Sequence, residues 1–189
     1  MKNILRYLYS RQLLVVAIII LLSVLIWALI NKRVGSRKRC RSVLKYANII
    51  ICFIEVAVVL YITVISRTSG EVEVCIIPFY SLVMAKGEPE MYRTMLMNVM
   101  LFVPLGLTMP YALRQSCSRK IMHTVLVALL LSTMIEGMQG IFHLGRAEID
   151  DVICNTLGAT VGSASYLMSD KMEKISIKKR FGVNHERSN

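Results

Sequence analysis

The stretch IEGMQGIFHLGRAEIDDVICNTLGATVG, residues 135–162, consists of two apolar segments joined by a short polar loop. Among the polar or ionisable residues that interrupt it are Glu136, Gln139, Arg146, Asp150, Asp151 and Asn155. Such side chains are costly in apolar surroundings and are retained there when they have partners or a function. The stretch therefore predicts a helical hairpin with a polar cluster near its turn.

Apolar segments of similar length occur along the whole chain. Hydrophobic residues make up 55% of the 189 residues, and a helix that crosses a bilayer needs about 20 residues. Five segments approach that length: residues 13–30, 43–65, 94–113, 121–142 and 152–168. We expect an all-α, polytopic transmembrane bundle of about five helices. The first segment has no small-residue cleavage site and precedes a basic stretch, which indicates a retained helix and not a signal peptide.

The net charge of +11 is distributed in a way that indicates membrane topology and not a nucleic-acid partner. Of the 23 Lys and Arg residues, seven lie within 31–45, three within 114–120 and six after residue 170. The positive-inside rule predicts that these regions, including the C-terminus, are cytoplasmic. The acid-rich segments 67–93 and 144–151 are then outside. Five spans also place the N-terminus outside, although its three positive charges oppose that orientation.

The chain divides into three parts by composition. Residues 1–70 form a two-helix membrane segment with a basic cytoplasmic loop, 71–168 a membrane domain, and 169–189 a basic cytoplasmic tail. The five cysteines have none of the paired spacings typical of a metal site or a disulfide framework.

Three of the predicted helices bring polar side chains to one level of the membrane. Asn98 and Asn155 each follow the start of a helix by about four residues, or about 6 Å, and Glu136 precedes the end of its helix by a similar distance. We expect these three side chains to lie together just beneath the outer interface of the membrane.

The last predicted helix has its polar residues and its small residues on one face. Asp151, Asn155, Gly158 and Gly162 are spaced so that they form a single stripe. Two glycines four residues apart allow another helix to approach closely within lipid. Asn155 is therefore expected to point into the bundle.

Each polar residue also has a structural interpretation. Asp150 or Asp151 can cap the helix that follows, and Asn155 and Gln139 can form hydrogen bonds between helices. Glu136 is the hardest to explain in this way, because a carboxyl group in the membrane must be protonated or paired. We favour a functional cluster over a purely structural one.

Glu55 lies in the middle of the second predicted helix, on the same face as Asn48. It can be an ion or proton relay, or a protonated carboxyl paired within the bundle. The second interpretation is favoured, since a single carboxylate is little support for transport.

Several strings of the sequence, taken in order, resemble the VanZ-like family of bacterial membrane proteins. They are IIPFYS (76–81), NVMLFVPLG (98–106), IEGMQ (135–139) and GRAEIDDVICNTLGATVG (145–162), and the resemblance covers about residues 76–166. The family is named after a protein associated with resistance to teicoplanin, a lipid-tailed glycopeptide, which implies a role at the cell envelope but no established reaction. The positions implied by its motif are Asn98, Pro104, Gly106, Glu136, Gln139, Arg146, Asp150, Asp151 and Asn155.

The first functional hypothesis is binding. A multi-pass protein of the cell membrane would bind an amphiphile of the outer leaflet, either a lipoglycopeptide or a lipid-linked cell-wall intermediate, and so affect sensitivity to teicoplanin. Membrane lipids would be its other partners. The residues expected to bind this ligand are Asn98, Gln139, Arg146 and Asn155.

The second hypothesis is an enzyme acting on a lipid-linked, phosphate-containing envelope precursor. Arg146 would pair with the phosphate, although it can also simply pair with Glu148 or an aspartate. Glu136 with Asp150 or Asp151 would act as acid and base or hold a divalent cation. The sequence has no Ser/His/Asp order, zinc spacing or glycine-rich phosphate loop, so neither an enzyme class nor a cofactor is assigned.

Overall fold

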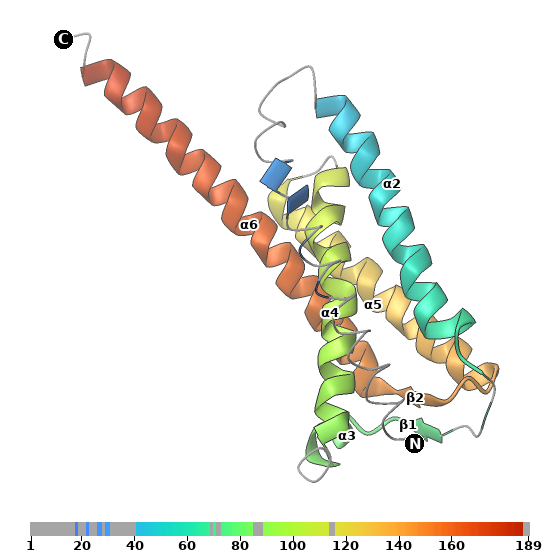
Figure 1. The fold of residues 1–189 in the computed structure, drawn as a ribbon. Coiled ribbons are helices and arrows are strands. Elements are labelled where there is room, and N and C mark those ends of the chain that lie inside the picture. Colours follow the sequence, from blue (N-terminus) through green and yellow to red (C-terminus); the bar gives the residue numbers. More distant parts are fainter. Residues whose placement is uncertain are drawn as a thin grey trace.

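The computed structural model describes residues 18, 22, 26–27, 29–30, 41–68, 70, 73–84, 89–113 and 116–186, with the side chains of 41, 89–90 and 168–186 excepted. These residues form a helical bundle (Figure 1), which confirms the all-α prediction. Its helices are α2 (Arg41–Leu60), the π-helical turn η2 (Tyr61–Ile65), α3 (Tyr80–Met84), α4 (Pro89–Ala112), α5 (Cys117–Ile141) and α6 (Ile149–Glu186).

Three helical segments are long and apolar enough to cross a membrane: Ser42–Ile65, Met91–Ala112 and Cys117–Ile141. The predicted spans 43–65, 94–113 and 121–142 coincide with them apart from a few residues at their starts. The predicted span 152–168 is helical within α6. Its polar and small residues make it less apolar than the three segments above, and it is not among them. The predicted span 13–30 falls largely outside the described residues.

Helices α4 and α6 make the most extensive contact in the bundle, and their backbones touch at glycines. A Cβ atom placed on Gly158 would lie 2.0 Å from the carbonyl oxygen of Val99, and one on Gly106 or Gly162 would lie 2.3 Å from a carbonyl oxygen of the other helix. Only glycine permits such an approach. This contact, named the glycine seam (Gly106, Gly158, Gly162), confirms the predicted packing face of the last helix.

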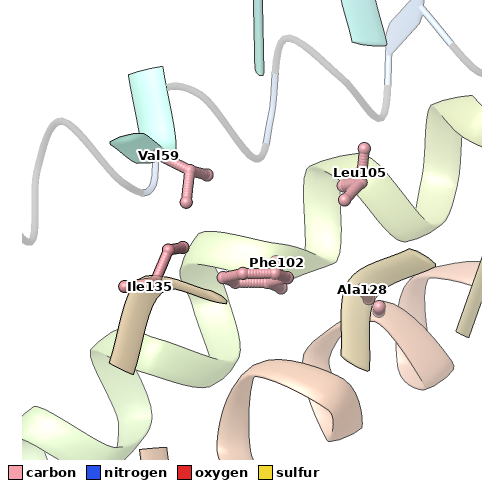
Figure 2. Close-up of a cluster of buried hydrophobic side chains, with 6 residues drawn as sticks. Val59, Phe102, Leu105, Ala128 and Ile135 are labelled. Carbon is pink, nitrogen blue, oxygen red and sulfur yellow. The ribbon is translucent and has the colours of Figure 1, made fainter. Parts of the chain in front are cut away.

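The apolar core lies between all four long helices. Figure 2 shows the buried side chains that form it: Val59, Phe102, Leu105, Ala128, Ile135 and Ala159. Helix α2 contributes Val59 to this core, and many of its other apolar side chains, such as Phe53 at 72% exposure, face outward. That distribution suits a helix with lipid on one side. The buried Asn48 of α2 accepts a hydrogen bond of 2.8 Å from Trp27 Nε1, which ties Trp27 to α2.

A two-stranded parallel sheet lies at one end of the bundle, and the sequence did not predict it. Strand β1 (Glu73–Cys75) pairs with β2 (Arg146–Glu148), with Glu73 opposite Arg146 and Cys75 opposite Glu148. Strands of three residues are too short to show the alternation that reveals a strand in sequence. The sheet and α3 lie where η2 and α5 end and where α4 and α6 begin (Figure 1). We call this the strand end: β1, β2, α3 and the adjoining residues 63–68, 136–145 and 149–155.

Candidate functional site

Two carboxyl groups from different helices approach each other at the strand end. Glu136, near the end of α5, and Asp151, in the first turn of α6, repel each other electrostatically. Burial and then the charge of Glu148 raise the pKa of Asp151 to about 6. The guanidinium of Arg67 and the side-chain amide of Asn98 oppose this rise, because both favour the ionised form.

Glu136 is held in place by the second strand. Its Oε2 accepts a hydrogen bond of 2.9 Å from the backbone N–H of Glu148. The predicted requirement for a partner is thus met by a main-chain donor, and α5 is tied to β2.

Arg146 is engaged by two carboxylates. Its Nε lies 3.0 Å from Glu73 Oε2 and 3.0 Å from Glu148 Oε1. The first ion pair joins β2 to β1. The second lies within β2 and is the structural alternative considered for Arg146 from the sequence. A phosphate group would have to compete with both carboxylates for this guanidinium.

Asp150 holds α3 against the bundle. Its Oδ1 accepts a hydrogen bond of 2.5 Å from the backbone N–H of Phe79, and its Oδ2 accepts one of 2.8 Å from that of Ser81. Phe79 has a positive φ of 63°, a conformation that a non-glycine residue keeps only when its surroundings hold it there. Asp150 is 3% exposed, so its carboxylate serves the fold. Helix α6 begins at Ile149, and both aspartates therefore lie in its first turn and not at its cap.

Gln139 and Asn155 form the hydrogen bonds between helices that the sequence allowed. Gln139 Nε2 donates to the carbonyl oxygen of Thr63 in η2 at 3.0 Å, and Asn155 Nδ2 donates to Ser132 Oγ of α5 at 2.8 Å. Both residues are almost fully buried. Their side-chain oxygens have no hydrogen-bond partner within the described part of the chain. Asn155 lies one helical turn after Asp151, and its partner Ser132 lies one turn before Glu136. The common level of Asn98, Glu136 and Asn155 in the membrane stays a prediction.

A family model with the description VanZ/LLP1 matches residues 13–170. The chain belongs to the VanZ/LLP1 family. Protein VanZ of Enterococcus faecium is 34% identical over 80 residues, which are 42% of this chain and 48% of that relative. The chain thus spans about half the length of this curated relative. No solved structure matches.

The match to the VanZ/LLP1 family extends beyond the motif strings. It includes the first two predicted helices, which the strings at 76–166 left unassigned. Family membership and three helices of membrane-spanning character together make this a VanZ-like membrane protein.

In this VanZ-like protein, the residues predicted as a site fall into two groups. Glu136, Asp151 and Asn98 come together at the strand end. The others have structural partners described above: Gln139, Arg146, Asp150 and Asn155. We call four acidic side chains of the strand end the carboxylate cluster: Glu136, Glu148, Asp150 and Asp151. No three Asp, Glu, His or Cys side chains in the described regions are placed to hold a metal ion.

Sequence reasoning missed three contributors to the site. Arg67 was treated only as a loop charge, yet it acts on both Glu136 and Asp151. Ser81 Oγ donates a hydrogen bond to Glu148. Two of these residues could have been found from the sequence. Ser81 ends the string IIPFYS, and Glu148 follows Arg146 by two residues, a spacing that puts both on one face of a strand. Arg67 had no comparable signal.

Proposed function

We propose that this VanZ-like protein binds an amphiphile at the strand end and so lowers sensitivity to lipoglycopeptides such as teicoplanin. The observation that carries the proposal is the approach of Glu136 to Asp151 with Arg67 and Asn98 beside them. Both carboxylate oxygens of Asp150 accept hydrogen bonds that hold the fold together, and Arg146 Nε is already paired with two carboxylates. Glu136 and Asp151 are the carboxyl groups that we assign to the ligand. A glycopeptide headgroup is rich in N–H and O–H donors, which carboxylates accept strongly.

An apolar surface next to the carboxylate cluster suits the tail of the amphiphile. Seven large apolar side chains of β1, α3 and the segment between them are exposed: Val74, Ile76, Ile77, Phe79, Leu82, Val83 and Met84. Asp150 holds this segment beside the cluster through the N–H groups of Phe79 and Ser81. A headgroup and a tail would thus find complementary surfaces at one end of the bundle.

The proposal places the strand end on the outer side of the membrane. The acid-rich segments belong to this end, and the basic segments 31–45 and 114–120 adjoin the opposite ends of α2, α4 and α5. The positive-inside rule then favours a cytoplasmic location for the opposite end and for the C-terminus. A reporter fused after Asn189 tests this orientation: a cytoplasmic signal is expected, and an external signal would contradict it.

Susceptibility to teicoplanin tests the binding site. Glu136→Gln and Asp151→Asn remove the charge of the pair while keeping the shape of the side chains. Expressed to the level of the parent, both variants should lose its effect on susceptibility. Gly137→Ala is the control, because it changes the neighbour of Glu136 at a position with open space. Parent-like susceptibility of both charge variants would make the cluster structural and refute the proposal.

The same pair supports a second candidate, an enzyme acting on a lipid-linked envelope precursor. Two carboxyl groups that repel each other favour a state in which one is protonated and the other ionised, as an acid and a base require. Arg67 is then better placed than Arg146 to meet a phosphate, since Arg146 already has two carboxylate partners.

Lipid and wall-precursor extracts distinguish the two candidates. An altered species that is present with the parent and lost with Glu136→Gln supports the enzyme. Unchanged extracts combined with a change in teicoplanin sensitivity support binding alone.

A further inference from the structure

Glu55 is a carboxyl group inside the bundle that the proposed site does not use. It lies within the membrane-spanning segment Ser42–Ile65. Its Oε2 is 2.6 Å from Thr108 Oγ1 of α4. Its Oε1 is buried and has no hydrogen-bond partner among the described residues. The contact joins α2 to α4 about eight residues, or about 12 Å, before Thr63 of η2.

The Thr108 hydroxyl has more hydrogen-bond acceptors around it than hydrogens to donate. Its hydroxyl carries one hydrogen, yet two acceptors are within reach: Glu55 Oε2 at 2.6 Å and the carbonyl oxygen of Pro104 at 3.1 Å. Cys52 Sγ lies 3.5 Å from the same hydroxyl and is a weak donor at best. An ionised Glu55 would take the hydroxyl hydrogen and leave its other charged oxygen without a partner.

A protonated Glu55 uses every hydrogen in this network. Its O–H donates to Thr108 Oγ1, and the Thr108 hydroxyl then donates to the carbonyl oxygen of Pro104. Only a neutral carbonyl oxygen, the second oxygen of Glu55, remains unpaired, and this costs far less than an unpaired charge.

Within the described regions, no cationic side chain compensates a charge on Glu55. The side chain that acts on it is Thr108 from α4, and Cys52 from its own helix lies beside the same hydroxyl. Nearby packing is apolar, through Val56 and Val59 of the same helix and the core of α4. An isolated carboxylate in such a place is strongly disfavoured.

We propose that Glu55 is a proton-binding site within the membrane, whose neutral carboxyl group holds α2 against α4 through Thr108. This inference is independent of the proposed amphiphile site, because it concerns residues outside the strand end. Of the two interpretations of Glu55 drawn from the sequence, a relay or a protonated carboxyl paired within the bundle, it favours the second. It also makes the α2–α4 contact sensitive to pH.

Infrared difference spectroscopy tests the protonation state directly. The full-length chain in phosphatidylcholine vesicles is compared with Glu55→Gln at pH 7. The parent-minus-variant spectrum should contain the C=O stretching band of a protonated carboxyl and lack a carboxylate band. Glu73→Gln is the matched control: its carboxylate is exposed and ion-paired with Arg146, so its difference spectrum should contain the carboxylate band. A carboxylate band for Glu55 would overturn the proposal.

Thermal unfolding gives a second, independent readout. An unfolded Glu is ionised at neutral pH, so folding of the parent would take up a proton at Glu55, and stability would fall as the pH rises. The unfolding midpoint of the parent should therefore decrease more steeply between pH 5 and pH 7 than that of Glu55→Gln. Equal slopes would contradict the proposal, as would loss of folded protein in Glu55→Gln, because glutamine has the shape of the neutral acid.

Discussion

The glycine seam and the carboxylate cluster both include residues of helix α6, but they depend on opposite kinds of interaction. At the seam, backbone meets backbone and no side chain intervenes. In the cluster, charged side chains from several elements meet at the edge of the bundle. The seam sets the position of α6 on α4, and this brings Asp151 near Asn98. We therefore expect seam variants to affect the whole fold and cluster variants to act locally.

Gly158→Ala should have the largest effect. The new methyl group would lie 2.0 Å from the carbonyl oxygen of Val99, and a backbone oxygen within a helix cannot move aside. We expect a loss of more than about 3 kcal/mol in the free energy of unfolding, measured by thermal unfolding in detergent. Gly137→Ala, which meets nothing within 4 Å, should instead be neutral or stabilising by up to about 1 kcal/mol. Equal behaviour of the two variants would show that the seam is not the close contact described.

Asp150→Ala should have an intermediate and local effect. It leaves the N–H groups of Phe79 and Ser81 without their carboxylate acceptor, at an expected cost of about 2 kcal/mol. Hydrogen exchange should accelerate at residues 79–81 while the amides of α4 and α5 keep their protection. Acceleration throughout the bundle would mean that the cluster, like the seam, determines the whole fold.

Asp151→Asn should change the free energy of unfolding least, and it should raise stability where the two preceding variants lower it. Because the pKa of Asp151 is raised to about 6, its ionised form opposes folding at pH 7, and the stability of the parent should rise as the pH falls from 7 towards 4. Asp151→Asn should remove this part of the pH dependence and stabilise the protein by about 1 kcal/mol at pH 7, after allowance for solvent screening. A variant less stable than the parent at pH 7 would show that the charge of Asp151 supports the fold.

The seam could be predicted from the sequence, whereas much of the cluster could not. Glycines four residues apart on an apolar helix form a local pattern with a single physical meaning, and apolar segments reveal helices in the same way. The polar residues within those helices, Glu136 and Asp151, were found for that reason.

The remaining contacts of the cluster join residues that are distant in sequence. Asp150 binds the N–H of Phe79, 71 positions away, and the two strands that align Glu73 with Arg146 are three residues long. No local pattern reports such a pairing. The role of Arg67 depends on how η2 ends beside α5, which only the folded chain determines.

The most direct test of the account is binding of teicoplanin to the full-length protein in phosphatidylcholine vesicles, measured by isothermal titration for the parent and for Glu136→Gln. Teicoplanin without its lipid tail serves as the control ligand, and empty vesicles correct for partition into lipid. We predict saturable binding to the parent, weaker binding of the tail-less compound, and at least about a tenfold loss of affinity in Glu136→Gln, as expected for one charge-assisted hydrogen bond. Equal binding to the parent, to Glu136→Gln and to empty vesicles would contradict the assignment of the strand end as an amphiphile site.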